Sequence, residues 1–171
     1  MNYATIKPWD IANGPGVRVS LFVSGCTHHC KDCFNPEAWD FDYGEPFTDA
    51  VMDHILDLLR PEYIRGITYL GGEPFDPHNQ PGLLELTRKI RAAYPEKSIW
   101  SFTGYVYGQN LPQLPGVTDA LLAGLDVLVD GPFIAARKNL SLRFRGSDNQ
   151  RLIDLPKTLK TGAVVLWDET Q

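Results

Sequence analysis

The order of apolar and polar residues predicts a chain of alternating strands and helices. Residues 17–23 alternate between apolar and other side chains, which is the period of a β-strand. Thr48 is a suitable N-cap for a helix that extends to about Arg60 and is closed by Pro61. A short apolar strand then covers Ile67–Leu70 and leads directly into a pair of glycines. Two strands with a helix between them are therefore expected in this part of the chain.

The same alternation continues through the second half of the chain. A helix is predicted to begin at Pro81, because proline suits the first helical turn and apolar residues follow at helical spacing. Strands are expected at Ser98–Phe102 and Asp126–Val129, with a helix at Thr118–Leu125 between them. This alternation is typical of an α/β fold with a parallel sheet and right-handed crossovers.

The length of the chain limits how far such a fold can close. A closed eightfold barrel needs at least about 200 residues, so this chain is expected to form a partial, open (β/α) barrel. Residues 151–155 and 163–167 are predicted to be terminal strands joined around Thr161-Gly162. Residues 1–171 are expected to form a single domain.

The composition is that of an ordinary globular protein, with 43% hydrophobic and 22% charged residues. The first residues lack the basic start and apolar run of a signal peptide, and we see no apolar stretch of the ~18 residues that a membrane helix needs. We therefore expect a cytoplasmic location and no membrane association. Thiols stay reduced in that compartment, which favours metal binding or catalysis over disulfides.

Charge is distributed unevenly along the chain. The formal net charge is -5, which gives no reason to expect nucleic-acid binding. Residues 137–151, called the basic segment below, hold five basic residues and one acidic residue, so they carry +4 and leave -9 for the rest. The basic segment could be a solvated face, or it could dock an acidic partner or a phosphate.

The three cysteines of the chain lie in one short loop, the cysteine loop, directly after the predicted strand at residues 17–23. Cys26, Cys30 and Cys33 have the spacing Cys-x3-Cys-x2-Cys. Three thiolates so placed can hold three corners of a cubic iron–sulfur cluster and leave the fourth iron without a protein ligand. A small molecule can chelate that open iron.

Zinc is the alternative metal for this loop. His28 or His29 could supply a fourth ligand to the three thiolates, which would make the chain a non-catalytic zinc-binding adaptor. Structural zinc sites usually take their ligands from two pairs on separate segments, and this chain has no second cysteine pair. The spacing alone leaves both metals open, and otherwise the two histidines are expected to be polar loop residues.

A second motif, Gly71-Gly72-Glu73-Pro74, follows the next predicted strand. Two adjacent glycines let the backbone approach a ligand closely, and freed carbonyl groups can accept hydrogen bonds from an ammonium group. A glycine pair by itself is more often only a turn. Its position at the carboxyl end of a parallel strand, where ligands bind in α/β sheets, favours a binding role.

Together, in this order, the cysteine loop and the glycine motif resemble those of the radical S-adenosylmethionine (SAM) enzymes. The resemblance implies a 4Fe-4S cluster bound by Cys26, Cys30 and Cys33, whose open iron is chelated by the amino and carboxylate groups of SAM. It also implies an open barrel of the radical SAM type and SAM contacts from Gly71, Gly72 and Glu73. Many family members have an aromatic residue before the third cysteine, where it lies against adenine. This chain has Asp32 there and Phe34 after, so the adenine contact is assigned to Asp32, Cys33 and Phe34.

Further segments resemble one branch of the family, the activating proteins of anaerobic ribonucleoside-triphosphate reductase. These segments are Trp100–Tyr105, Val129–Phe133 and Arg145–Arg151, and Asn13-Gly14-Pro15-Gly16-Val17-Arg18 resembles the Gly-Pro-Gly-x-Arg signature of enzymes that activate glycyl-radical partners. The resemblance implies that the reduced cluster passes one electron to SAM, which breaks into methionine and a 5′-deoxyadenosyl radical. That radical then removes a hydrogen atom from a glycine in the large subunit of the reductase, the glycyl radical protein.

The resemblance also sets expectations for partners and for the shape of the site. A flavodoxin-type protein would donate the electron. A barrel too short to close would leave a lateral opening for a polypeptide substrate, and the basic segment could flank it.

The alternative within the family is a short enzyme that acts on a small molecule of the deazapurine type. No nucleophile, triad or carboxylate pair in the sequence demands a catalytic role, which agrees with radical chemistry.

Overall fold

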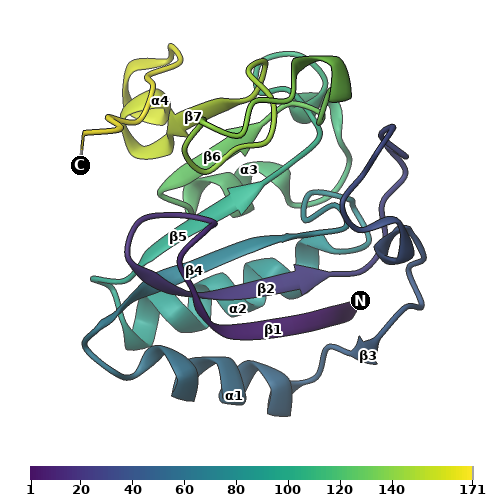
Figure 1. The fold of residues 1–171 in the computed structure, drawn as a ribbon. Helices are drawn as coiled ribbons and strands as arrows, with labels where there is room; N and C mark the ends of the chain where they lie inside the picture. Colours follow the sequence, from purple (N-terminus) through teal and green to yellow (C-terminus); the bar gives the residue numbers. More distant parts are fainter. Residues whose placement is uncertain (171) are drawn as a thin grey trace.

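The computed structural model describes residues 1–170 and contains one seven-stranded mixed sheet, with strands in the order β3-β1-β2-β4-β5-β6-β7 (Figure 1). The strands are β1 (Asn2–Asp10), β2 (Val17–Val23), β3 (Glu45–Pro46), β4 (Ile64–Gly71), β5 (Ser98–Phe102), β6 (Val127–Asp130) and β7 (Arg151–Asp154). The α-helices are α1 (Asp49–Leu59), α2 (Gln80–Ala93), α3 (Thr118–Ala123) and α4 (Leu155–Thr161). Three short 3₁₀ helices are η1 (Pro36–Trp39), η2 (Leu111–Gln113) and η3 (Ala135–Arg137).

The centre of the sheet confirms the predicted alternation of strands and helices. Strands β2, β4, β5 and β6 are parallel neighbours, and α1, α2 and α3 lie in the connections between them. The bounds of β2 and β5 are those predicted, and Thr48 caps α1 by accepting a hydrogen bond from the Val51 amide at 3.4 Å. The carboxyl ends of the four parallel strands therefore meet at one edge of the sheet.

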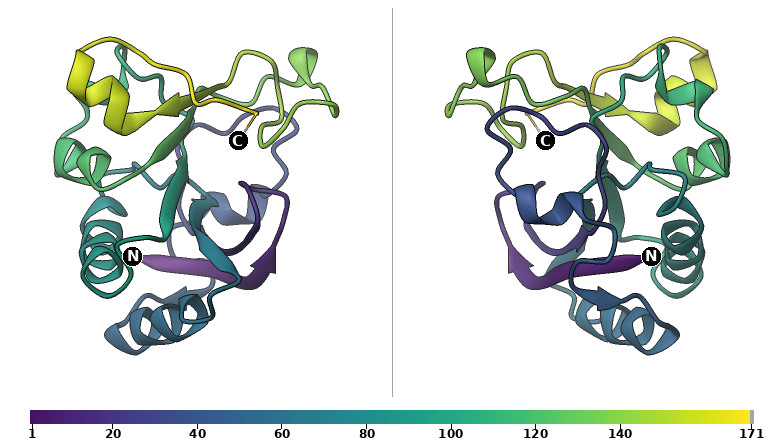
Figure 2. Two further views of the ribbon diagram at one scale, coloured as in Figure 1. Left: turned by 90° about the vertical axis from the view of Figure 1, so that its left-hand side faces the viewer. Right: turned by 90° about the vertical axis from the view of Figure 1, so that its right-hand side faces the viewer.

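The two faces of the sheet are covered by different parts of the chain. Helices α1, α2 and α3 pack on one face, while the cysteine loop and the basic segment lie toward the other (Figure 2). Because side chains alternate along a strand, Val19 and Leu21 enter the core beneath the helices. On the other face Trp100 and Val129 form a second apolar cluster, against which Phe144 packs.

The antiparallel edges of the sheet differ from the prediction. Strand β1 was not predicted, so the cysteine loop follows the second strand of the chain rather than the first. Of the two predicted terminal strands, residues 151–155 correspond to β7, but 163–167 do not form a strand and contribute only an isolated bridge from Leu166 to Ile153. The connection between them contains α4 instead of a simple turn.

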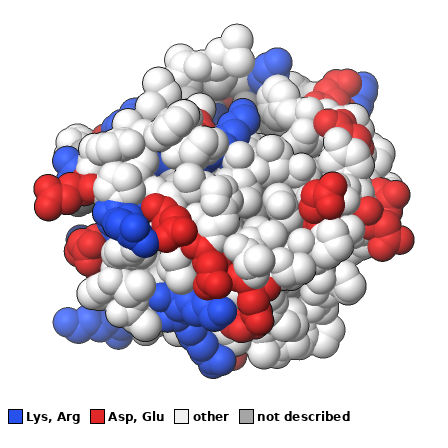
Figure 3. Space-filling view, turned by 90° about the horizontal axis from the view of Figure 1, so that it is seen from below, with Lys and Arg blue, Asp and Glu red and all other residues white. Residues whose placement is uncertain are grey.

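The sheet is not closed, because its order runs from β3 at one edge to β7 at the other. The α/β class is thus correct, and the chain forms an open mixed sheet. The side that carries α1 shows both acidic and basic side chains (Figure 3). Within α1 and its C-cap, Asp57 and Arg60 form an exposed ion pair at 2.6 Å. No helix within residues 1–170 combines the length and the apolar character needed to cross a membrane.

Candidate cluster and cofactor site

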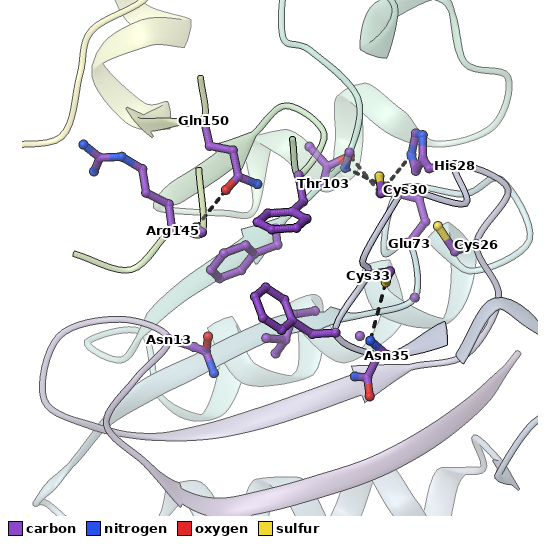
Figure 4. Close-up of a pocket in the computed structure, with 18 of the residues that line it drawn as sticks. Asn13, Cys26, His28, Cys30, Cys33, Asn35, Glu73, Thr103, Arg145 and Gln150 are labelled. Atoms are coloured by element: carbon purple, nitrogen blue, oxygen red, sulfur yellow. Dashed lines mark hydrogen bonds and ion pairs between the residues drawn. The ribbon is translucent and has the colours of Figure 1, made fainter. Parts of the chain in front are cut away.

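Four loops at the carboxyl ends of the parallel strands line one cavity of about 470 Å³ (Figure 4). Cys26 follows β2, Gly72 follows β4, Thr103 follows β5 and Gly131 follows β6, and all four residues line this cavity. Cavities of roughly 300–1,000 Å³ are typical of small-molecule and cofactor sites. The cavity is therefore where the topology of a parallel sheet places a ligand.

The cysteine loop places all three of its thiols at this cavity. Cys26, Cys30 and Cys33 are partly buried and line its wall. The start of the loop is anchored to η1, since the Gly25 amide donates to the Ala38 carbonyl at 2.7 Å. Three thiols brought to one cavity by a short anchored loop fit the three-point ligation of a 4Fe-4S cluster.

The loop is also held by a ring stack and by an unusual backbone conformation. The imidazole of His29 stacks on the Trp39 ring, with centroids 4.3 Å apart and planes at 17°. His29 and Asp32 have positive φ angles of 50° and 58°, which is uncommon for residues with a side chain. Such conformations persist where the surrounding structure holds them, and here the stack of His29 on Trp39 contributes to that support.

Burial disfavours the thiolate form of two of the three cysteines, Cys26 and Cys30. Burial raises the pKa of the Cys26 thiol to about 11 and also raises the pKa of Cys30. Metal ligation requires thiolates, so a cationic centre has to supply the stabilisation that the protein alone does not. Within residues 1–170 no group of three or more His, Cys, Asp or Glu side chains converges closely enough to hold a single metal ion.

The Gly71-Gly72-Glu73 turn is joined to the cysteine loop through the backbone. The Gly72 amide donates to the Val23 carbonyl at 2.8 Å, and the Glu73 amide donates to the Gly25 carbonyl at 2.7 Å. A Cβ on Gly72 would lie 2.5 Å from the Gly25 oxygen and 2.9 Å from the Ala38 oxygen. Only glycine allows this approach, so the two motifs are packed as one unit.

Glu73 is buried, with 2% exposure, and its carboxylate accepts four hydrogen bonds. Oε1 accepts from the Phe75 amide and the Thr103 hydroxyl, each at 2.8 Å. Oε2 accepts from the Gly104 amide at 2.7 Å and pairs with Nε2 of His28 at 2.8 Å (Figure 4). The carboxylate therefore fixes the loops that surround it.

His28 is the site residue that sequence reasoning missed. It was expected to be a fourth zinc ligand or otherwise a polar loop residue, but its side chain is only 18% exposed and bonds to Glu73. The hydrogen bond to Glu73 raises the pKa of His28, against the opposing effect of burial. The only signal in the sequence was the presence of a basic side chain in one motif and an acidic side chain in the other.

Of the three residues assigned to the adenine contact, two line the cavity and one does not. Cys33 and Phe34 line the cavity, whereas Asp32 is exposed and lies outside its lining. The Phe34 ring is 69% exposed and contacts Phe133, with centroids 5.1 Å apart. Lys138 lies over the Phe34 ring at 5.6 Å. A pair of aromatic rings thus stands at the mouth of the cavity.

The segment Asn13–Arg18 supports the opposite side of the site. Asn13 lines the cavity, while the fully buried Arg18 guanidinium donates to Thr68 at 3.0 Å and to the Ser98 hydroxyl at 2.8 Å. Burial lowers the pKa of Arg18 to about 10. The hydrogen bonds of Arg18 tie the glycine–proline loop to β4 and β5, so its role is structural.

The basic segment contributes to the cavity wall and also carries exposed charges at Arg137, Lys138 and Arg143. Phe144, Arg145, Gly146 and Gln150 line the cavity. Most of its charges have partners within the chain. Arg145 pairs with Glu169 at 3.0 Å, Arg151 with Asp130 at 2.5 Å, and Arg137 with Asp148. Arg145 and Arg151 are partly buried in these pairs, whereas Arg137 is exposed.

A cavity with three thiols at the carboxyl edge of an α/β sheet fits a protein of the iron–sulfur class. Residues 12–153 match the family described as "4Fe-4S single cluster domain". The chain is 44% identical over 152 residues to the anaerobic ribonucleoside-triphosphate reductase-activating protein of Escherichia coli K12, covering 88% of this chain and 96% of that protein. The protein of the same name from Vibrio cholerae is 41% identical over 88% of this chain and 96% of that protein. The one from phage T4 is also 41% identical, over 89% of this chain and 93% of that protein. The chain belongs to the family of anaerobic ribonucleoside-triphosphate reductase-activating proteins.

Proposed function

We propose that this protein is a radical SAM activase that generates a glycyl radical on the large subunit of an anaerobic ribonucleoside-triphosphate reductase. The observation that carries the proposal is the convergence of Cys26, Cys30, Cys33 and the Gly71-Gly72-Glu73 turn on one cavity. Membership of the family supports it, since its named members activate that reductase. Residues 1–171 would form a single radical SAM domain with an open (β/α) barrel of that type.

In this proposal the three thiolates bind a 4Fe-4S cluster, and the neighbouring turn binds SAM. When bound and reduced, the cluster would supply the one electron needed to cleave SAM into methionine and a 5′-deoxyadenosyl radical. Gly71 and Gly72 would offer backbone carbonyls to the ammonium group of SAM. Gly71 has φ of 107°, and a Cβ there would lie 2.7 Å from the Val23 oxygen, so the close approach needs glycine.

Glu73 would act on SAM by holding the turn in place. Its carboxylate already accepts four hydrogen bonds, so it has little remaining capacity for a ligand. The aromatic pair Phe34 and Phe133 would contact the adenine, together with the backbone of Asp32 and Cys33. These contacts orient the cofactor and exclude water, which a primary carbon radical requires.

The protein substrate would enter beside the basic segment. The two edge strands of the sheet do not pair with each other, so the sheet is not closed into a barrel. The segment containing Phe144 and Arg145 forms one wall of the cavity. A glycine-bearing loop of the reductase would reach the cofactor past Phe34 and Lys138, which stand exposed at the mouth. The electron would come from a flavodoxin-type protein.

The proposed function is tested by electron paramagnetic resonance. The anaerobically reconstituted and reduced protein is mixed with SAM and the large subunit of the reductase, with SAM omitted from the control. We expect a glycyl-radical doublet only in the complete mixture. A reconstituted protein that cleaves SAM but never transfers the radical would favour the small-molecule alternative, and zinc without inorganic sulfide would favour the adaptor.

A further inference from the structure

The His28–Glu73 contact joins the two motifs that make up the site. His28 lies between the first two cysteines of the cysteine loop, and Glu73 follows the two glycines of the turn. Their side chains meet at 2.8 Å although they are 45 residues apart in the chain. His28 is the partner of the Glu73 carboxylate that the cysteine loop supplies. The other three donors belong to Phe75, Thr103 and Gly104, which lie outside that loop.

The lack of a side chain at Gly104 leaves space for the His28 ring. A Cβ on Gly104 would lie 2.6 Å from Cδ2 and 2.7 Å from Nε2 of His28, so a larger residue at this position would displace the ring. The Tyr105 ring meets the imidazole edge to face, with centroids 4.5 Å apart. The ring is therefore held between Tyr105, Gly104 and Glu73, and it cannot turn away without losing all three contacts.

We propose that His28 is a positioning residue, whose hydrogen bond to Glu73 holds the cysteine loop and the Gly71-Gly72-Glu73 turn in one fixed relation. The consequence for SAM binding rests on the proposed function. The cysteine loop would hold the open iron and the glycine turn would bind the ammonium group, so a fixed relation between them keeps both within reach of one SAM molecule. His28 touches neither ligand in this account. It acts through the Glu73 carboxylate, and no proton transfer is involved.

The direct test uses metal-free protein and amide hydrogen exchange. The amides of Phe75 and Gly104 donate to Glu73, so their exchange rates report the position of that carboxylate. His28→Phe keeps an aromatic ring and removes the hydrogen bond, while His28→Gln restores a donor at a similar reach. His29→Phe is the matched control, because it removes an imidazole from the same loop but retains a ring to stack on Trp39.

We expect His28→Phe to speed exchange at Phe75 and Gly104 at least tenfold. His28→Gln and His29→Phe should stay within threefold of the unmodified protein. A change of less than threefold in His28→Phe would overturn the proposal. So would a His28→Gln variant that exchanges as fast as His28→Phe, because the effect would then come from the packing of the ring.

A second measurement separates this inference from the proposed function. In reconstituted protein, SAM binding is followed by its effect on the paramagnetic resonance spectrum of the reduced cluster. We expect His28→Phe to need at least tenfold more SAM for half of the spectral change, with His28→Gln close to the unmodified protein. An unchanged SAM requirement in His28→Phe overturns the positioning role. If the unmodified protein itself shows no response to SAM, the proposed function fails, while the exchange experiment still decides the His28–Glu73 link.

Discussion

The carboxylate of Asp10 accepts a hydrogen bond from the hydroxyl of Ser20 at 2.6 Å, between β1 and β2. Both side chains are buried, with 7% and 0% exposure. Asp10 also accepts from the Ala12 amide at 2.8 Å and from the Asn13 side chain at 2.6 Å. One carboxylate thus closes the loop that brings Asn13 to the cavity, and this contact links β1 to the site.

Replacing Asp10 with asparagine should change how stability depends on pH. Burial acts to raise the pKa of Asp10, but the hydrogen bonds from Ser20, Ala12 and Asn13 outweigh it and lower the pKa below 3.8. The ionised group therefore stabilises the fold above pH ~4, and this contribution is lost as the pH falls through the depressed pKa. We expect Asp10→Asn to lower the free energy of unfolding by about 1–2 kcal/mol at pH 7.

Urea denaturation of metal-free protein between pH 7 and pH 2.5 measures this effect. The gap between the unmodified protein and Asp10→Asn should narrow below pH ~4. Asp57→Asn is the control, because Asp57 is in an exposed ion pair. This variant should change the free energy of unfolding by no more than about 0.5 kcal/mol. A gap that stays constant down to pH 2.5 would contradict the assigned role of the Asp10 carboxylate.

Gly72→Ala should separate the two motifs of the site. The added Cβ would meet the backbone oxygens of Gly25 and Ala38 at 2.5 and 2.9 Å, and backbone atoms cannot yield as a flexible side chain can. Overpacking of this kind costs roughly 1–3 kcal/mol. We expect a loss of that size in the free energy of unfolding and a cluster spectrum that no longer responds to SAM.

The matched control is Gly82→Ala in helix α2, where the nearest atom is the flexible Met1 sulfur at 3.2 Å. Alanine favours a helix over glycine by up to about 1 kcal/mol, so this variant should be as stable as the unmodified protein or more stable. Equal behaviour of the two alanine variants would refute the close-packing argument.

The parallel centre of the fold could be predicted because its signals are local. Residues 17–23 alternate clearly, and Thr48 and Pro61 mark the ends of the first helix. Strand β1 was missed because its residues are mostly partly exposed and it contains Pro8, so no buried face shows in the pattern. Its strand conformation depends on pairing with β2, which is a tertiary effect.

The error at the C-terminus was avoidable, since α4 has recognisable cap signals. The Asp154 side chain accepts from the Lys157 amide at 3.1 Å, Pro156 lies in the first turn, and Gly162 ends the helix with φ of 76°. A run of aspartate, leucine and proline before a polar stretch is a helix start. Interpreting Gly162 as a hairpin turn overlooked its role as a helix C-cap.

The candidate site could be predicted in its motifs but not in its supports. The cysteine spacing and the glycine pair are local patterns, and both line the cavity. The pairing of His28 with Glu73 and of Arg145 with Glu169 joins residues distant in the sequence. No periodicity in the chain encodes these contacts, so only the fold reveals them.

Trp167 should stabilise the wall of the cavity from behind. Its ring packs edge to face on Trp100, with centroids 4.9 Å apart, and lies 6.2 Å from the Phe144 ring. Trp167→Ala removes this support, and because Trp167 is only partly buried we expect a loss of about 2 kcal/mol, below the 3–5 kcal/mol of a fully buried aromatic.

Denaturant unfolding and amide exchange of residues 141–146 measure the effect of Trp167→Ala. Exchange in this part of the basic segment should become faster, because Phe144 loses a neighbour. Leu166→Ala is the control, as Leu166 is 62% exposed and should change stability by less than about 0.5 kcal/mol. Unaltered exchange at residues 141–146 would show that Trp167 does not support the wall.

The central claim is that three thiolates hold a cluster whose open iron binds SAM, and 5′-deoxyadenosine formation tests it most directly. The protein and its Cys26→Ala, Cys30→Ala and Cys33→Ala variants are reconstituted without oxygen, reduced and supplied with SAM. We expect the unmodified protein to hold about four iron and four sulfide per chain and to release 5′-deoxyadenosine, while each variant releases none. Normal release of 5′-deoxyadenosine by Cys30→Ala would contradict the account.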